Sequence, residues 1–369
     1  MTASTKTVIE LPNGVEMPVL ALGAAPLMTS KEDSSDFNPL NSFNGFLPER
    51  VCRSVHALLE MKAEKNEGGN GDKGRSTPVH IDTALVYRTH PHIRQALGNA
   101  LATGKIQRSE VFLTTKVFHP CYSFGPEDLG HSMPSDPECE MTYEDVYSFV
   151  YRQFQQSLYE CGVGYFDMVL LHWPGRNHPK TDATKNAQHR LAAWHVLEDC
   201  YAKGWTRAIG TSNFSEHHLE ELQIKNEASK TKIKEGSRGG APAVKPHVNQ
   251  IEASVFIQHK SILDYCMKNG IAAMAYSPCG RGVMHVAEDE MVQNIAAKYG
   301  KDAGQVAMKY LFQKGYGSVV FWTTNVQRIR SNHDIHDFEL NETELKILDG
   351  LNRSDGSGTW GLTSPYEIP

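Results

Sequence analysis

The chain has 369 residues, of which 40% are hydrophobic and 22% charged, a composition typical of globular proteins. Its net charge of −6 excludes the basic surface that nucleic-acid binding requires, and no apolar run reaches the length of a membrane span. We therefore expect one domain over residues 1–369, of a size that barrels with insertions reach, acting as a monomer on a small molecule.

Cysteine usage and the first residues of the chain predict a cytoplasmic location. The seven cysteines are widely spread and form no C-x-x-C pair, which favours reduced thiols over a disulfide framework. The segment from Met1 to Thr7 has no apolar stretch of the kind found in signal peptides.

The first predicted element is a β-hairpin. Residues 7–11 and 16–20 are strand-like and flank Asn13-Gly14, a pair that favours a type I′ turn. Helix and strand patterns then alternate to the end of the chain. Strands are predicted at residues 79–82, 111–116, 166–172, 206–211, 246–251, 271–276 and 318–322. Helices are predicted at residues 48–65, 91–102, 143–161, 187–203, 215–224, 259–269, 288–300, 303–314, 325–332 and 342–351.

Repeated strand–helix units without an antiparallel block indicate a parallel sheet covered by helices. Closure into a barrel explains these seven strands better than an open sheet does. Polar residues lie at the ends of many strands, whereas in an open sheet they would cluster at a single switch point. An eighth strand is expected in the weak stretch around Ala272, or within a helix and strand merged above. The predicted fold is α/β, a (β/α)8 TIM barrel with an N-terminal β-hairpin.

Four segments interrupt the pattern, and we interpret them as surface insertions: 29–45, 65–75, 118–141 and 225–240. The third differs from the others because it contains Phe118, His119 and several prolines and follows a strand end. It is predicted to cover a substrate, with a plain surface loop as the alternative.

Two motifs match the residue pattern of known signatures but not the structural context that those signatures require. Gly69 to Gly74 reads G-x-G-x-x-G, but a strand follows it where the dinucleotide fingerprint requires a preceding one, so we interpret it as a loop. His90 and His92 form the H-x-H pair that metal-dependent barrel hydrolases place behind the first strand. The last strand ends Phe321-Trp322-Thr323 and offers no Asp ligand. We predict surface histidines and no metal, and keep metal-dependent hydrolysis as an alternative.

Four polar residues predict a catalytic site. Asp82, Lys116 and His172 each end an apolar strand, and Tyr87 follows Asp82 closely, so a barrel would bring them to one face. An ammonium beside a phenol lowers the phenol pKa from its ordinary ~10, which suits a general acid. Asp82 can hold the lysine charged, and a neutral imidazole can donate a hydrogen bond to a substrate oxygen. The group predicts proton transfer to or from an oxygen.

Several ordered motifs make the chain resemble the aldo-keto reductase family over nearly its whole length. They are 81–87 (IDTALVY), 113–117 (LTTKV), 165–174 (YFDMVLLHWP), 207–214 (RAIGTSNF), 248–252 (VNQIE), 275–280 (AYSPCG), 328–332 (RIRSN) and 337–340 (DFEL).

The resemblance implies NAD(P)H-dependent reduction of an aldehyde or ketone to an alcohol. Tyr87 would donate the proton, Lys116 and Asp82 would adjust the pKa of Tyr87, and His172 would orient the substrate oxygen. The implied cofactor site has three parts: side chains that hold the nicotinamide, a loop around the pyrophosphate and a group at the adenosine end. Its residues are Gly23, Asp82, Ser212, Asn213, Gln250, Tyr276, Ser277, Gly280, Gly282, Thr323, Arg328 and Asn332. The expected substrate walls are Phe118, His119 and Trp173, and the tail 356–369 is expected to add Trp360 and Tyr366.

Departures from the family pattern bear on the cofactor. Trp322 stands where many members have the lysine that pairs with the 2′-phosphate of NADP, although Thr323 and Arg328 can still bind a phosphate. NADP(H) is therefore expected, with NAD(H) left open. Gly23-Ala24-Ala25 replaces a Gly-Thr-Trp that contacts cofactor in many members. A regulatory protein that binds cofactor on the same fold with little turnover is the alternative function.

Overall fold

The computed structural model describes residues 6–25, 48–68, 77–118, 141–175, 182–232, 243–282, 284–353 and 365–368. The predicted insertion 29–45 lies outside the described residues, as do 69–75, 119–140 and 233–240 of the other three. The expected substrate walls His119 and Trp360 also lie outside them.

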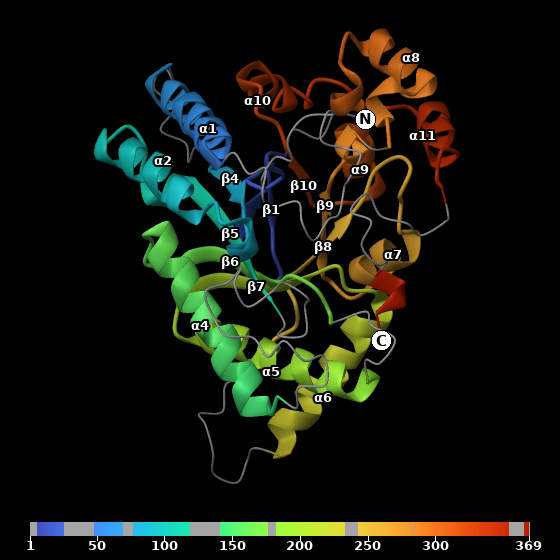
Figure 1. The fold of residues 1–369 in the computed structure, drawn as a ribbon. Helices are drawn as coiled ribbons and strands as arrows, with labels where there is room; N and C mark the ends of the chain where they lie inside the picture. The colour runs from blue at the N-terminus through green and yellow to red at the C-terminus, as the bar shows by residue number, and fades with distance from the viewer. Residues whose placement is uncertain are drawn as a thin grey trace, which may run out of the picture.

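Eight parallel strands close into a barrel, which confirms the predicted fold (Figure 1). Around the barrel the order is β10, β3, β4, β5, β6, β7, β8, β9. The strands are β3 (Leu20–Gly23), β4 (Val79–Asp82), β5 (Val111–Val117), β6 (Phe166–Leu171), β7 (Thr206–Ser212), β8 (Val248–Glu252), β9 (Ala272–Tyr276) and β10 (Ser318–Phe321). Closure comes from the pairing of β3 with β10, in which Leu20 lies opposite Val319.

The eighth strand is not where the sequence placed it. The hairpin is short, with β1 (Val8–Glu10) antiparallel to β2 (Glu16–Pro18), and the chain then enters β3 at Leu20. The predicted hairpin strand 16–20 had absorbed the start of this barrel strand. Pro18 lacks an N–H and ends β2, which leaves the apolar segment from Leu20 free to pair in the barrel.

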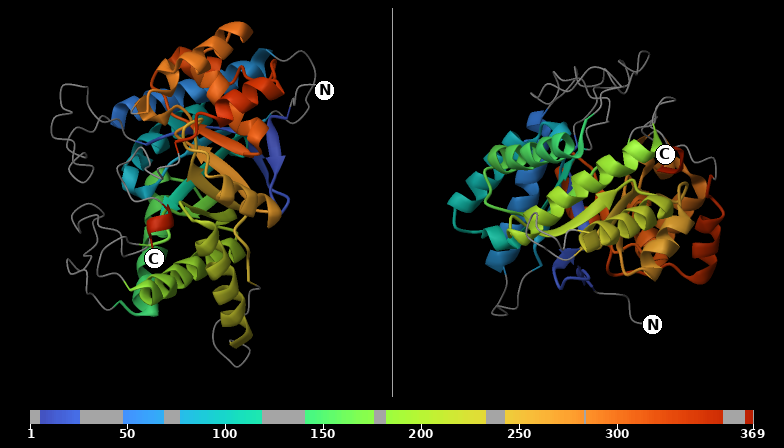
Figure 2. Two further views of the ribbon diagram at one scale, coloured as in Figure 1. Left: turned by 90° about the vertical axis from the view of Figure 1, so that its right-hand side faces the viewer. Right: turned by 90° about the horizontal axis from the view of Figure 1, so that it is seen from below.

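Helices surround the barrel, as the three views show (Figure 2). They are α1 (Pro48–Gly68), α2 (His90–Ala102), α4 (Tyr143–Cys161), α5 (Ala183–Ala202), α6 (Glu216–Lys232), α7 (Lys260–Lys268), α8 (Glu290–Tyr299), α9 (Ala303–Lys314), α10 (Val326–Asn332) and α11 (Glu342–Asp349). Within the described ranges, none of these helices has the length and hydropathy that crossing a bilayer demands.

Two predicted insertions begin inside helices. Helix α1 continues to Gly68 and α6 to Lys232, so residues 65–68 and 225–232 are helical rather than inserted loop. Both stretches are polar, which hid them from a search for apolar periodicity. Their lysines, glutamates and alanine are nevertheless good helix formers, so helix propensity supports both continuations. In α6 a buried polar contact contributes as well, because Asn226 donates to Glu198 Oε1 at 2.8 Å.

Alternation along each strand separates two cores and aims the polar residues inward. In β5, Phe112 joins the cluster inside the barrel, whereas Val111 and Leu113 pack against the helices. In β6, Met168 and Leu170 are inside and Val169 is outside. Because side chains alternate with a period of two, Asp82, Lys116 and His172 follow the inward series. All three lie at the carboxyl ends of their strands.

Candidate active site

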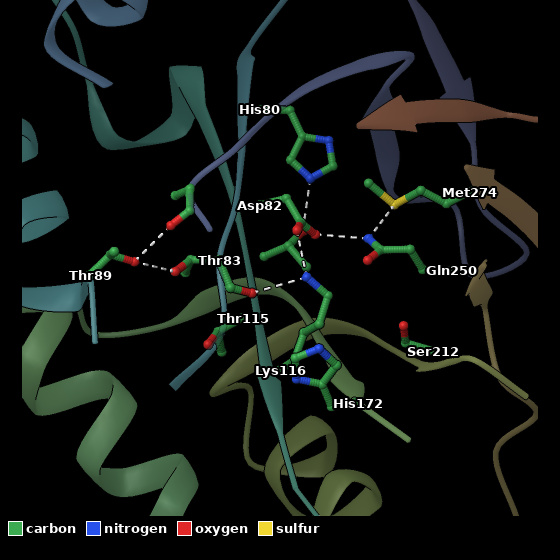
Figure 3. Close-up of polar contacts among 12 residues, drawn as sticks. His80, Asp82, Thr83, Thr89, Thr115, Lys116, His172, Ser212, Gln250 and Met274 are labelled. Carbon is green, nitrogen blue, oxygen red and sulfur yellow. Dashed lines mark hydrogen bonds and ion pairs between the residues drawn. The ribbon is translucent and has the colours of Figure 1, made fainter. Parts of the chain in front are cut away.

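A buried ion pair joins two neighbouring strands at the mouth of the barrel. The Lys116 Nζ lies 2.5 Å from Asp82 Oδ1 and donates a second hydrogen bond of 3.2 Å to the carbonyl oxygen of Thr83 (Figure 3). Lys116 is 1% exposed and Asp82 4%. Burial lowers the pKa of Lys116 from 10.5, and the negative charge of Asp82 opposes that shift. The carboxylate of Asp82 therefore stabilises the charged ammonium of Lys116 at a position that is buried away from water.

Tyr87 reaches this pair from a short turn that follows β4. The 3-10 helix η3 (Leu85–Tyr87) is closed by a 3.0 Å hydrogen bond from the Tyr87 N–H to the Ala84 carbonyl. The Lys116 Nζ lies 5.4 Å from the centre of the Tyr87 ring, and the His172 ring lies 5.7 Å from it, edge to face at 83°. The structure therefore brings the four predicted catalytic residues together.

His172 is held as a neutral imidazole. Its ring stacks on Phe118 with centres 4.6 Å apart. Burial lowers the pKa of His172 well below 6.5, and the charge of Lys116 lowers it further. Its Nδ1 has no hydrogen-bond partner among the described residues. Such an imidazole carries one N–H that can be donated to an oxygen and adds no second positive charge.

Amide side chains at the ends of β7 and β8 connect to the catalytic residues. Asn213 Nδ2 donates to the carbonyl oxygen of His172 at 2.9 Å and to Ser212 Oγ at 3.2 Å. Asn213 Oδ1 accepts a hydrogen bond of 2.8 Å from the Tyr276 hydroxyl. Asn213 itself has a left-handed backbone, with φ +61°. The predicted carboxamide site is thus a connected network rather than a set of separate side chains.

Gln250 has a contact that the sequence did not predict. Its Nε2 donates to Asp82 Oδ2 at 2.8 Å and approaches the Met274 sulfur at 3.2 Å (Figure 3). Each carboxylate oxygen of Asp82 therefore has its own donor, Lys116 on one and Gln250 on the other. No motif signals this pairing, because 168 residues separate the two side chains in sequence.

The loop after β9 has an unusual backbone and carries a cation. Ser277, Gly280 and Arg281 all have φ between +54° and +62°. Burial lowers the pKa of Arg281, and the charges of Glu252, Tyr276 and Tyr87 oppose the shift. Arg281 is thus a cation near the Tyr87 phenol that sequence reasoning did not single out, although it lies in the loop predicted to wrap the pyrophosphate. Gly282 ends the short helix η6 (Gly280–Gly282) of that loop.

The residues predicted for the adenosine end lie around β10 and α10. The exposed Trp322 donates from Nε1 to the carbonyl oxygen of Ala25 at 3.0 Å. Thr323 is buried and accepts a hydrogen bond from the Asn325 N–H, whereas Arg328 is exposed. Asn332 is buried at the end of α10.

Gly23, the remaining predicted cofactor residue, lies in the barrel wall. A Cβ at this position would be 3.2 Å from Val320 Cγ1 and 3.4 Å from the Phe321 carbonyl oxygen. The glycine therefore lets β3 pack closely against β10, and this close packing is the role that the structure gives it.

Apolar side chains form a small cluster beside Tyr87. Ala84, Val86, Phe118, Trp173 and Ile368 are buried together there, and Tyr87 packs against them. Phe118 and Trp173 were predicted to line the substrate site. Ile368 lies in the tail 356–369 that was expected to shape the substrate site, but Trp360 and Tyr366 were named there in its place.

The predicted surface position of the H-x-H pair is wrong for His90, whereas His92 is half-buried. The His90 side chain is fully buried at the start of α2, with Nε2 3.1 Å from Thr115 Oγ1 and Nδ1 3.4 Å from a carboxylate oxygen of Glu160. In the part of the chain that the structure describes, no group of three or more His, Cys, Asp or Glu is arranged to hold a metal.

Comparisons with known proteins agree with this geometry. The sequence profile of the aldo/keto reductase family matches residues 70–353. Glyoxal reductase of Bacillus subtilis is 28% identical over 358 residues, 97% of each chain. D-galacturonate reductase of Fragaria ananassa is 30% identical over 301 residues, covering 78% of this chain and 82% of that protein. The crystal structure of a Bombyx mori aldo-keto reductase in complex with NADP superposes with a TM-score of 0.66 at 25% identity, covering 95% of this chain and 94% of the other.

Proposed function

This chain belongs to the aldo/keto reductase family and reduces an aldehyde or ketone to an alcohol, and we propose that Tyr87 donates the proton in that reaction. The observation that carries the proposal is the buried Lys116–Asp82 pair beside the Tyr87 ring. Relatives named as reductases of a dicarbonyl and of a sugar acid support a small carbonyl substrate.

The proton leaves the Tyr87 hydroxyl for the carbonyl oxygen, and the nearby ammonium stabilises the phenolate that remains. Asp82 supports this by holding Lys116 charged and in place. His172 orients the same oxygen by donating the single N–H of a neutral imidazole, because the lowered pKa keeps the ring uncharged at neutral pH. The stacked Phe118 fixes the plane of that imidazole.

The polar groups around the mouth fit a nicotinamide dinucleotide. The amides of Asn213 and Gln250 and the hydroxyl of Ser212 suit a carboxamide, and Tyr276 offers a ring surface beside them. The left-handed backbone at Ser277, Gly280 and Arg281 and the half-buried guanidinium of Arg281 suit a pyrophosphate. When bound, the cofactor supplies the hydride that reduces the carbonyl carbon.

We propose NADP(H) as the preferred cofactor. Arg328 is exposed at the start of α10 and can bind a phosphate with two parallel hydrogen bonds. The Bombyx mori relative with a bound NADP supports this choice. The missing cation at Trp322 weakens the preference, so NAD(H) is proposed as a second, poorer cofactor.

Replacing Tyr87 by Phe tests the catalytic assignment. The Tyr87→Phe variant keeps the ring packing but lacks the proton donor, so turnover should fall by at least about a thousandfold, within the range expected for general acid catalysis. NADPH binding, followed by tryptophan fluorescence, should stay within about twofold. A variant that keeps most of its rate with a panel of aldehydes would show that another group donates the proton.

Replacing Arg328 by Ala tests the cofactor preference. Loss of a charge-assisted contact to the 2′-phosphate should weaken NADPH binding about tenfold or more and leave NADH binding almost unchanged. Trp322→Lys should strengthen NADPH binding in the same titration. Equal losses for the two cofactors in Arg328→Ala would argue against a phosphate contact at this residue.

A further inference from the structure

The last described residues return to the mouth of the barrel. The short helix η8 (Pro365–Glu367) lies beside α6 and α7, at the red end of the ribbon (Figure 1). The Tyr366 hydroxyl is 2.8 Å from Ser261 Oγ in α7. The next residue but one, Ile368, is 5% exposed and belongs to the apolar cluster beside Tyr87.

One histidine of α6 holds this segment. His218 Nε2 lies 2.8 Å from the carbonyl oxygen of Ile368, and its side chain is buried. On the other side of the ring, the N–H of Ser215 donates to His218 Nδ1 at 3.1 Å. The Ile368 carbonyl can only accept, so the ring carries a proton on Nε2. In the neutral ring Nδ1 accepts from the Ser215 N–H, and it also lies 2.9 Å from Ser215 Oγ. The backbone therefore fixes the tautomer that donates to Ile368.

The ring stays in this neutral form over the working pH range. Burial lowers the pKa of His218 to about 4, and the positive charges of Arg190 and His217 contribute, while Glu221 and the Ile368 carbonyl oppose the shift. Protonation would place an N–H on Nδ1 against the N–H of Ser215, but Ser215 Oγ, 2.9 Å away, can accept from it, so burial is the cause that keeps the ring neutral.

The same histidine connects to the cofactor side of the site. Ser215 lies two residues after Asn213. The side-chain amide of Asn213 donates to the carbonyl oxygen of His172. The rings of Phe214 and His218 also meet edge to face, with centres 5.9 Å apart. His218 thus links the segment that follows β7 to Ile368 near the C-terminus.

We propose that His218 is a positioning residue that latches Ile368 over the site, so that Ile368 limits the size of the carbonyl compound that reaches Tyr87. The inference rests on the proposed role of Tyr87, because the apolar cluster is a substrate wall only if the reaction occurs there. Phe118 and Trp173 are the largest other side chains of that cluster, which also contains Ala84 and Val86. Small apolar aldehydes fit beside it, and loosening the latch admits bulkier ones.

Four single variants test the latch by steady-state kinetics at saturating cofactor. The ratio of kcat/KM for a bicyclic aromatic aldehyde to kcat/KM for propanal should rise about tenfold in His218→Leu and in Ile368→Ala, a range typical of pocket-size effects. His218→Gln should stay near the wild type, because its amide N–H can replace the Nε2 donor. The exposed neighbour His217 provides the matched control, and His217→Leu should leave the ratio unchanged.

A double variant shows whether His218 acts through Ile368. If it does, His218→Leu combined with Ile368→Ala gives the ratio of Ile368→Ala alone, whereas independent effects would multiply. An unchanged ratio in His218→Leu, or multiplied effects in the double variant, would overturn the proposal.

Hydrogen exchange measures the latch without any turnover. The backbone amides of residues 366–368 should exchange faster in His218→Leu than in the wild type, and at wild-type rates in His217→Leu. Unaltered exchange in His218→Leu would reject the latch even if the enzyme is active. A wild-type protein that reduced no carbonyl compound would instead contradict the proposed function, with the exchange result still deciding the latch.

Discussion

At the mouth of the barrel, the amide of Gln250 reaches Asp82 across the barrel interior, since β4 and β8 lie four strands apart around the closed sheet. The carboxylate thus receives donors from two sides, and its position depends on both. We infer that Gln250 supports the geometry of the Lys116–Asp82 pair in addition to any contact with cofactor.

The Gln250→Leu variant separates these two roles. Loss of a hydrogen bond to a buried carboxylate costs about 1.5–3 kcal/mol, so Tm should fall, and kcat should fall about tenfold as the ion pair loosens. Gln293 is an exposed amide on α8, and Gln293→Leu should change neither quantity. If Gln250→Leu raised only the KM for cofactor, the hydrogen bond to Asp82 would have no catalytic importance.

Residues that end strands were the predictable part of the site. Asp82, Lys116 and His172 were found because strand alternation and parallel topology decide where such side chains go. Tyr87 followed from its distance to Asp82. The contacts of Gln250, Arg281 and Ile368 were not predictable, because each depends on how distant segments meet in three dimensions.

Among the secondary-structure elements, β7 shows how closely the strands of the barrel approach. A Cβ at Gly210 would lie 2.4 Å from the Val248 carbonyl oxygen and 2.8 Å from Leu170 Cδ2. These atoms belong to the two strands that flank β7. Glycine is therefore needed at this position for close packing.

Two glycine replacements should have opposite effects on stability. Gly210→Ala forces the strands apart and should lower the free energy of unfolding by about 2 kcal/mol or more. Gly98 lies on the exposed face of α2 with nothing within 4 Å of an added Cβ. Gly98→Ala should therefore raise the free energy of unfolding by up to about 1 kcal/mol through helix propensity. Urea denaturation of both variants checks the pair, and a neutral effect at Gly210 would contradict the packing argument.

Element boundaries were predicted well where apolar periodicity was strong, as for α4 and α9, whose residue ranges agree with the sequence interpretation. The boundaries were predicted wrongly where apolar periodicity did not determine the end of the element. Helix α6 continues on propensity through a lysine-rich stretch, and β3 follows the hairpin without a turn signal that would separate it. Pattern reasoning detects apolar periodicity, and neither boundary is marked by a change in that periodicity.

For the molecule as a whole, buried histidines should make stability depend on acidity. His80, His218 and His247 lie in different parts of the fold, and burial lowers the pKa of each from 6.5 to about 4. Each ring is neutral when folded and binds a proton more readily when unfolded. Their contribution to stability is therefore complete above pH 6.5 and is lost as the pH falls from 6.5 towards 4.

Urea denaturation between pH 7.5 and pH 4.5 measures this dependence. The free energy of unfolding should fall with decreasing pH by up to about 1.4 kcal/mol per pH unit for each histidine. His247→Gln should reduce the slope below pH 6.5, and replacement of the exposed His217 should not. A free energy that stayed constant from pH 6.5 to pH 5 would show that these rings are protonated in the folded protein.

Pairing of β3 with β10 joins residues that are nearly 300 positions apart, Leu20 with Val319. During synthesis the amino-terminal barrel strand must therefore wait, with one edge uncovered, until the ribosome has made almost the entire polypeptide. Such a long-range closure slows folding, because the entropy of a very large loop is lost before the last ladder forms. The nascent chain consequently has a prolonged interval in which chaperones can engage that unpaired edge.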